Sequence, residues 1–197
     1  AVSESGERVT ARSVVSTMPI PLLLDALGGA DREAFAGRFH HNDTYIAAVG
    51  LKGGRRPPRF GACHWVFFAG AEAFYRVTVM SAFRPDAPTT LVAEVTRKAG
   101  TPPPDVLASD VGRGLVSGGL VASEADVAFS ECRLERFTYP IPTVGMEADR
   151  KRLEDSLAAR RLYLLGRSGR WDYVNTDGIF ARADALAASR GPGLAGG

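Results

Sequence analysis

The 197-residue sequence has few of the residues from which metal sites and disulfide frameworks are built. Its two cysteines, Cys63 and Cys132, stand far apart and form no C-x-x-C pair, so we expect reduced thiols and a cytoplasmic protein. The neighbours His40 and His41 would leave a strand on opposite faces, and His64 has no acid or thiol at ligand spacing. The sequence therefore predicts no metal site.

Long apolar runs and an excess of one charge are also missing. No stretch approaches the roughly 20 apolar residues of a membrane span, and a net charge of +2 gives no strong attraction for nucleic acid or a membrane surface. No G-x-S-x-G motif marks a hydrolase nucleophile. The polar start lacks a signal-peptide apolar segment and a methionine, so we expect a start set by processing, cloning or fragmentation. We expect the tail, residues 191–197, to be disordered.

The residues that are present describe an ordinary soluble globular protein. Apolar residues make up 45% of the chain and charged residues 23%, and the length suits one domain or one and a fraction. Of the 24 basic residues 21 are arginines. This bias reflects genome composition, or it provides a few arginines that bind anions through two hydrogen bonds, which lysine does poorly.

Apolar periodicity and turn residues predict many short elements. Extended segments are expected at 7–11, 13–17, 43–51, 63–68, 74–80, 90–96, 125–137 and 161–165. Helices are expected at 22–27, at 31–37 with Asp31 as N-cap, at 102–116 opened by three prolines, at 147–159, and after residue 178 up to Ser189. The Val14–Val15 pair indicates a strand buried on both faces, and residues 52–59 a polar, mobile loop.

The order of these elements predicts an α+β fold with α/β character at its ends. An antiparallel sheet backed by helices suits the middle of the chain. Each end contributes a short apolar strand, as though both strands belonged to a separate parallel sheet. We find no internal repeat.

The stretch 162–178 has the strongest functional pattern. A buried strand leads into a glycine-containing loop rich in cations and aromatic rings, with Arg167, Arg170, Trp171 and Tyr173, and then into a helix N-terminus. Backbone N–H groups and the positive end of the helix dipole suit a phosphate or an electron-rich ring. An arginine beside aromatic rings could hold a diphosphate and a flat ring, although such residues also occur on ordinary surface loops.

Two residues outside this stretch are further candidates. Alternation along 74–80 places Phe74, Arg76 and Thr78 on one face of a strand, where a buried Arg76 needs an anion or acceptors; an edge-strand arginine facing water is the alternative. Tyr139 lies between prolines that enforce an extended path, so its phenol could donate to a phosphate or a carbonyl, or simply pack. Asp177 could serve as the N-cap of the last helix.

These candidates coincide with a known pattern. Segment 73–78, Ala-Phe-Tyr-Arg-Val-Thr, is similar to Pro-Tyr-Thr-Arg-Ile of UDP-galactopyranose mutases, and Val9–Pro19 resembles the strand pair before the substrate helices of FAD-dependent amine oxidoreductases. The similarity is best over Tyr139–Leu186. There, Tyr-Pro-Ile and Gly166-Arg-Ser-Gly-Arg-Trp-Asp-Tyr-Val-Asn-Thr-Asp177 match the mutase segments Tyr-Pro-Ile and Gly-Arg-x-Gly-x-Tyr-x-Tyr-x-Asp-Met-Asp. The resemblance covers most of the chain and is specific over about a quarter of it.

The resemblance implies roles for substrate-binding residues. Arg76 and Arg167 match the two arginines that grip the diphosphate of a nucleotide-sugar beside the flavin. Tyr139 and Tyr173 match tyrosines that hydrogen-bond those phosphates. No residue of the protein is expected to be catalytic in the covalent sense, because in such enzymes the flavin carries the chemistry and the protein supplies position and charge.

The resemblance also implies cofactor-binding residues, namely Gly166, Arg167, Gly169, Asn175 and Asp177, which would contact or shape the flavin site. One departure lies here: the aspartate and methionine of the mutase pattern are replaced by Asn175 and Thr176, so a negative charge is lost. A second departure is that no G-x-G-x-x-G loop follows an N-terminal strand, and this loop would hold the ADP part of FAD.

The chain thus resembles the carboxyl-terminal half of a flavoprotein. By this resemblance, residues 1–20 form a strand pair of the FAD-domain type, 21–138 the substrate-binding sheet and helices, and 139–190 the return to the flavin. We expect FAD to bind only if a partner chain supplies the dinucleotide-binding half; a homo-oligomer is the other expected assembly, and the substrate is a small molecule, possibly a nucleotide-sugar. The alternative is a non-catalytic module that binds a nucleotide-sugar or a protein on the same scaffold.

Overall fold

The structure is a computed structural model that describes residues 2–54, 60, 63–84, 86, 89–103 and 107–190. It divides into two compact units. Unit 1 contains the residues up to His41 together with those from Tyr139 onward, and unit 2 contains Asn42–Thr138. The chain passes from unit 1 to unit 2 near the start of one strand and returns near the end of another.

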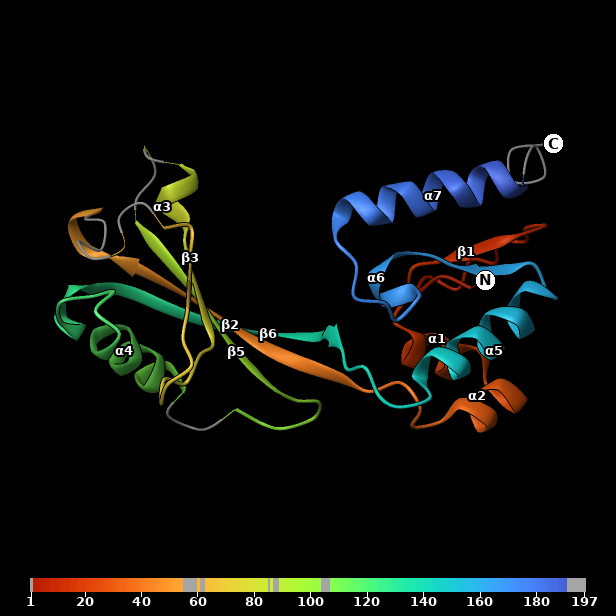
Figure 1. The fold of residues 1–197 in the computed structure, drawn as a ribbon, viewed down its shortest axis with the longest axis horizontal. Helices are drawn as coiled ribbons and strands as arrows, with labels where there is room; N and C mark the ends of the chain where they lie inside the picture. Colours follow the sequence, from red (N-terminus) through yellow and green to blue (C-terminus); the bar gives the residue numbers. More distant parts are fainter. Residues whose placement is uncertain are drawn as a thin grey trace. The chain divides into compact units, whose positions relative to one another are not determined.

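The fold is α+β, as the sequence predicts, and Figure 1 labels most of its elements. The elements of unit 1 are β1 (Val14–Ser16), α1 (Ile20–Leu27), α2 (Gly29–Phe35), α5 (Met146–Ala158), β7 (Leu162–Leu164), α6 (Gly166–Gly169) and α7 (Thr176–Arg190). The elements of unit 2 are β2 (His41–Leu51), η1 (Lys52–Gly54), β3 (Trp65–Phe67), β4 (Arg76–Val79), α3 (Met80–Phe83), β5 (Thr90–Lys98), α4 (Leu107–Ser117), η2 (Glu124–Asp126) and β6 (Val127–Pro140).

Unit 2 is built on a five-stranded sheet in the order β3-β4-β5-β2-β6. The pairs β3/β4, β4/β5 and β2/β5 are antiparallel, which confirms the antiparallel sheet expected for the middle of the chain. The register places Val77 and Ala47 on either side of Ala93, and Val79 and Val49 on either side of Leu91. Because directly opposite residues share a face, these apolar side chains form one continuous surface.

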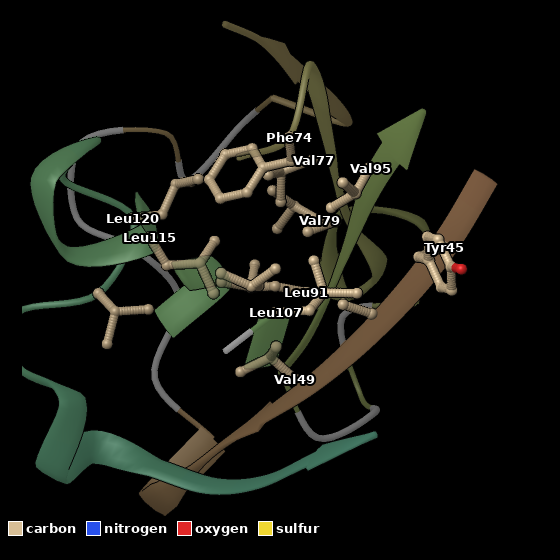
Figure 2. Close-up of a cluster of buried hydrophobic side chains, with 14 residues drawn as sticks. Tyr45, Val49, Phe74, Val77, Val79, Leu91, Val95, Leu107, Leu115 and Leu120 are labelled. Carbon is tan, nitrogen blue, oxygen red and sulfur yellow. The ribbon is translucent and has the colours of Figure 1, made fainter. Parts of the chain in front are cut away.

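The core of unit 2 lies between this surface and helix α4 (Figure 2). The helix contributes residues at helical spacing, Leu107, Val111 and Leu115, and all three are buried. Phe74 and Leu120 also belong to this core. The prediction from alternation that Phe74 shares a face with Arg76 and Thr78 is therefore wrong. Phe74 precedes the first residue of β4, so the two-residue period of the strand does not extend to it.

Unit 1 contains a second, separate sheet. Strands β1 and β7 pair in parallel with Val14 opposite Leu162 and Ser16 opposite Leu164, which confirms that the two ends of the chain share a parallel sheet. Helix α5 packs against β7 and α2, and its Leu153 and Leu157 are fully buried on one face, as predicted.

Three predictions for the first 40 residues are wrong. Val14 and Val15 are exposed rather than buried on both faces, because the described sheet of unit 1 has two strands and leaves β1 with one neighbour. Residues 7–11 form no strand and contribute one isolated bridge, between Val2 and Arg8. Asp31 is not an N-cap, because α2 starts after Gly28, whose positive φ separates it from α1.

The other predicted elements are present with shifted ends. The predicted helix 102–116 is α4, but Pro102 and Pro103 precede it without helical structure, while residues 104–106 lie outside the described residues. Residues 55–59 of the predicted mobile loop and the predicted disordered tail 191–197 also lie outside them. Among the helices of the described part, none is both long and apolar enough to cross a membrane.

Candidate functional site in unit 1

The candidate site of unit 1 begins where β7 ends. The backbone N–H of Leu165 donates to the carbonyl of Ser16 at 2.9 Å, so the strand pair continues one residue further. Gly166 then turns the chain with φ +84°, a left-handed conformation that suits glycine, and the short helix α6 follows. A Cβ atom on Gly169 would lie 2.7 Å from the Ser16 carbonyl oxygen, so only glycine lets α6 approach β1 this closely. The predicted loop therefore contains a helical turn fixed by two glycines with different roles.

Trp171 anchors the segment after α6 in the core. Its side chain is 1% exposed, its indole Nε1 donates to the carbonyl oxygen of His40 at 3.0 Å, and its ring meets those of Phe39 and His41 edge-on. The residue adopts a positive φ of 53°, which turns its side chain away from the path that simple alternation would give it. The ring is thus part of the core and does not lie beside Tyr173 as a surface for a ligand.

Three predicted residues of unit 1 come together, and we call them the Arg167 cluster: Tyr139, Arg167 and Tyr173. The guanidinium carbon of Arg167 lies 4.7 Å from the ring centroid of Tyr173 and 5.3 Å from that of Tyr139. The two rings stack with centroids 5.8 Å apart and an angle of 26°. The Nε of Arg167 donates to the carbonyl of Val174 at 3.2 Å, which holds the guanidinium against both rings.

Arg167 differs from its charged neighbours in having no carboxylate partner within the described part of the chain. Arg170 pairs with Glu154 at 2.8 Å. Asp172 pairs with Arg150 and with Arg182. The segment thus holds several ion pairs and one arginine whose charge these pairs do not compensate, so Arg167 is the group best suited to an external anion.

Asn175 and Asp177 lie at the start of the 15-residue helix α7, and both are exposed. The helix begins at Thr176, and the carbonyl of Asn175 accepts a hydrogen bond from Ile179. Asp177 is therefore inside the first turn, and its predicted role as N-cap is wrong. A carboxylate there still stabilises the helix through the dipole.

In unit 2, Arg76 has a partner that the sequence did not reveal. β4 lies between β3 and β5, so Arg76 is not on an edge strand. It stands opposite Glu94 in the β4/β5 register, and its Nε and NH2 donate to Glu94 Oε1 at 2.8 and 2.5 Å. The hydroxyl of Tyr75 donates to Glu94 Oε2 at 2.7 Å. Glu94 is thus the acceptor that a partly buried arginine needs.

A signal for Glu94 did exist in the sequence. A single carboxylate interrupts the apolar strand segment Thr90–Thr96, just as a single arginine interrupts 74–80. Two opposite charges in neighbouring apolar strands favour a cross-strand pair, but the register that brings them together was not predictable. Within the residues described, no group of histidine, cysteine or acidic side chains could hold a metal ion.

The sequence matches no protein-family model and no curated protein. The structure is similar to that of reduced UDP-galactopyranose mutase, with a TM-score of 0.83 and 25% identity over 99% of this chain and 45% of that one. It is also similar to a protein assigned as a protoporphyrinogen oxidase from Exiguobacterium sp. 255-15 (TM-score 0.62, 18% identity, 79% and 36% covered). A third similar structure is a CLA-producing fatty acid isomerase from P. acnes (TM-score 0.60, 12% identity, 90% and 41% covered).

Two conclusions follow from these comparisons. The likenesses at 18% and 12% identity show a shared fold. The chain also spans less than half the length of each of the three structures, so it corresponds to part of such a protein.

Proposed function

We propose that this chain is the substrate- and flavin-facing half of an FAD-dependent oxidoreductase or mutase-like enzyme, and that it works with a separate dinucleotide-binding half. The observation that carries the proposal is the Arg167 cluster, an arginine without a carboxylate partner among the described residues, held over two stacked tyrosine rings. It lies in the segment whose sequence matches the mutase pattern. The likeness to the mutase structure over 99% of the chain supports the same assignment.

The residues around the β7–α6 turn fit one end of such a cofactor. A Cβ atom placed on Gly166 would meet nothing within 4 Å among the described residues, so a flat ring has room to approach the backbone there. Gly169, in contrast, is already in close contact with the end of β1, and its role is to hold the turn in place. When bound, FAD would supply hydride transfer or nucleophilic chemistry that the side chains lack.

The protein's own contribution is to bind and orient. The Arg167 guanidinium would neutralise an anionic group of the substrate or cofactor, and the phenols of Tyr139 and Tyr173 would donate hydrogen bonds to the same group. Asn175 and Asp177 would flank the ring at the start of α7. The family resemblance assigns Arg76 to a phosphate as well, but its charge is compensated by Glu94.

The sheet of unit 1 supports the requirement for a second half. Parallel sheets occur almost only where both faces are covered and several strands pair. In the described residues this sheet has two strands, and Val14 and Val15 of β1 are exposed. A dinucleotide-binding half that adds strands beside β1 would cover this apolar surface, as would a second copy of the chain. We expect such an assembly to be cytoplasmic.

The test is flavin retention. The chain would be purified alone, with added FAD, and together with the dinucleotide-binding segment or subunit, and visible absorbance would be recorded after gel filtration. We expect the yellow cofactor to remain only in the partnered form. If no partnered form keeps flavin, the proposal is rejected.

One observation favours a second candidate function, a non-catalytic module that binds a nucleotide-sugar or a protein. Asn175 and Thr176 stand where the mutase pattern has aspartate and methionine, so a charge beside the ring is lost. Calorimetry with UDP, UDP-sugars and FAD separates the two functions. Affinity for the nucleotides without affinity for FAD, even with the partner present, supports this second function.

A further inference from the structure

One face of the unit 2 sheet points away from the core shown in Figure 2. The registers place two rows of residues across this face. The first row is Phe67, Arg76, Glu94 and Ile46, and the second is Trp65, Thr78, Val92 and Ala48. Because directly opposite residues share a face, both rows lie on the side opposite α4. We call these eight residues the open sheet face.

The polar centre of the open sheet face carries no net charge. The side chains of Arg76 and Glu94 are 26% and 10% exposed, and two hydrogen bonds join them. Tyr75 donates to the second oxygen of Glu94, and the guanidinium also lies over the rings of Phe67 and Tyr75 at 5.9 and 5.7 Å. This hydrogen bonding satisfies the carboxylate within the sheet.

Large, exposed aromatic side chains lie on the same side of the sheet as this neutral pair. Trp65 is 53% exposed and Phe67 68%, and both lie on the edge strand β3. Phe129, 53% exposed, brings a third ring: a Cβ atom on Gly50 would lie 2.0 Å from its Cε1, so the ring rests against Gly50. Alternation along β2 puts that Cβ on the side of Ala48, so this ring also reaches the open sheet face.

We propose that the open sheet face binds an uncharged, flat and largely apolar ring of the substrate, and not a nucleoside diphosphate. This inference rests on the proposed function, because it names the substrate class for the substrate-facing half. Exposed aromatic rings gain from stacking against a flat ligand and from removing apolar surface from water. A ligand without charge leaves the Arg76–Glu94 pair intact.

A diphosphate is disfavoured at this place for an electrostatic reason. To take Arg76 as its ligand, it would bring a second anion beside the carboxylate of Glu94, and like charges at such distances repel. It would also separate the pair and leave the largely buried Glu94 without its cation, which is costly. In this inference Arg76 is therefore not the diphosphate ligand that the family resemblance implies; together with Glu94 it forms a polar surface without net charge beneath the ring.

Two probes with the same ring test this inference, 2-naphthol and 2-naphthyl phosphate. Both would be titrated calorimetrically at neutral pH into the full chain carrying Arg167→Gln, so that the Arg167 cluster does not contribute. We expect naphthol to bind more tightly than naphthyl phosphate. Phe67→Ser should weaken naphthol binding about two- to tenfold through the lost ring contact. Phe180→Ser, which removes an equally exposed ring from α7, should leave it unchanged.

Glu94→Gln provides the second arm of the test. It removes the negative charge beside the Arg76 guanidinium and should raise affinity for naphthyl phosphate about tenfold or more, the effect of a hydrogen bond to a charged group. Tighter binding of the phosphate in the protein that retains Glu94 overturns the inference. An affinity for naphthol that is the same in Phe67→Ser also overturns the inference. This comparison still tests the inference if Glu94→Gln fails to fold. A partnered form that keeps its flavin but prefers the phosphate overturns this inference and leaves the proposed function standing.

Discussion

Replacing Arg167 by glutamine is the most informative perturbation of unit 1. The substitution removes a positive charge that has no carboxylate partner among the described residues, and it keeps an uncharged NH2 donor on a shorter side chain. Within the protein it removes the contacts to the rings of Tyr139 and Tyr173 and the hydrogen bond to Val174. Its effects on stability and on anion affinity are therefore separable.

The structure sets the expected size of each effect. Tyr173 is 65% exposed, so the two cation–π contacts belong to the weak end of the range, about 0.5–1 kcal/mol each. We expect the free energy of unfolding to fall by about 1–2 kcal/mol in total. A charged hydrogen bond to phosphate contributes about 1.5–3 kcal/mol, which corresponds to about 10- to 150-fold in affinity.

The assay is isothermal titration calorimetry with pyrophosphate at low salt, where charge effects are largest. Arg170→Gln is the matched control, because Arg170 lies on the same segment but is paired with Glu154. We expect Arg167→Gln to lose affinity and Arg170→Gln to keep it. Equal losses in both variants, or none in Arg167→Gln, would refute the assignment of the Arg167 cluster as the anion site. The pyrophosphate affinity of Arg167→Lys should lie between those of the unchanged protein and Arg167→Gln, since lysine keeps the charge but not the planar guanidinium.

The remaining predictions concern packing and reactivity. Gly169→Ala should lower the free energy of unfolding by about 1–3 kcal/mol, because its Cβ would meet the backbone of β1. Gly178→Ala meets only a methyl group of Val174, which a χ1 rotation can move, and it gains helix propensity in α7, so it should cost less than Gly169→Ala in the same denaturant titration. Trp171→Phe should cost about 1–3 kcal/mol, since it leaves part of a buried ring's volume empty and removes the indole hydrogen bond to the His40 carbonyl, which keeps the backbone N–H of Ile141 as a donor; a thermal melt with no shift would contradict this. Partial burial raises the pKa of the Cys132 thiol, so its thiolate is scarce at neutral pH. In a Cys63→Ser background, alkylation of Cys132 should therefore be slower in the folded protein than in the same variant unfolded in urea, and should accelerate as the pH rises; equal rates at neutral pH would count against it.

The structure brings the residues of the predicted site together to different extents in the two units. Tyr139, Arg167 and Tyr173 could be named together because they belong to one recognisable pattern, and the structure brings their side chains into contact. For Arg76 the sequence indicated the need for an acceptor but not which one. Glu94 is 18 residues away, and its position opposite Arg76 depends on the register of β4 and β5.

Burial could not be predicted for several residues of the terminal segments. A Val-Val pair has the pattern of a strand covered on both faces, yet Val14 and Val15 are exposed because coverage depends on which strands lie alongside. Trp171 looked like a surface ring on a cationic loop. Its positive φ and the carbonyl of His40, 131 residues away, place it in the core instead.

Local chemistry in the sequence was enough to predict the α+β class, the antiparallel middle, a short apolar strand at each end and the cationic, aromatic character of the segment after β7. These features follow from side-chain period, turn residues and composition, which act over a few neighbouring positions. The tertiary structure alone decided which charges are compensated, since it pairs Arg76 with Glu94 and Arg170 with Glu154 and gives Arg167 no carboxylate within the described residues. The physical reason is that charge compensation and close approach depend on the segment that lies opposite in space, and that segment is distant in the chain.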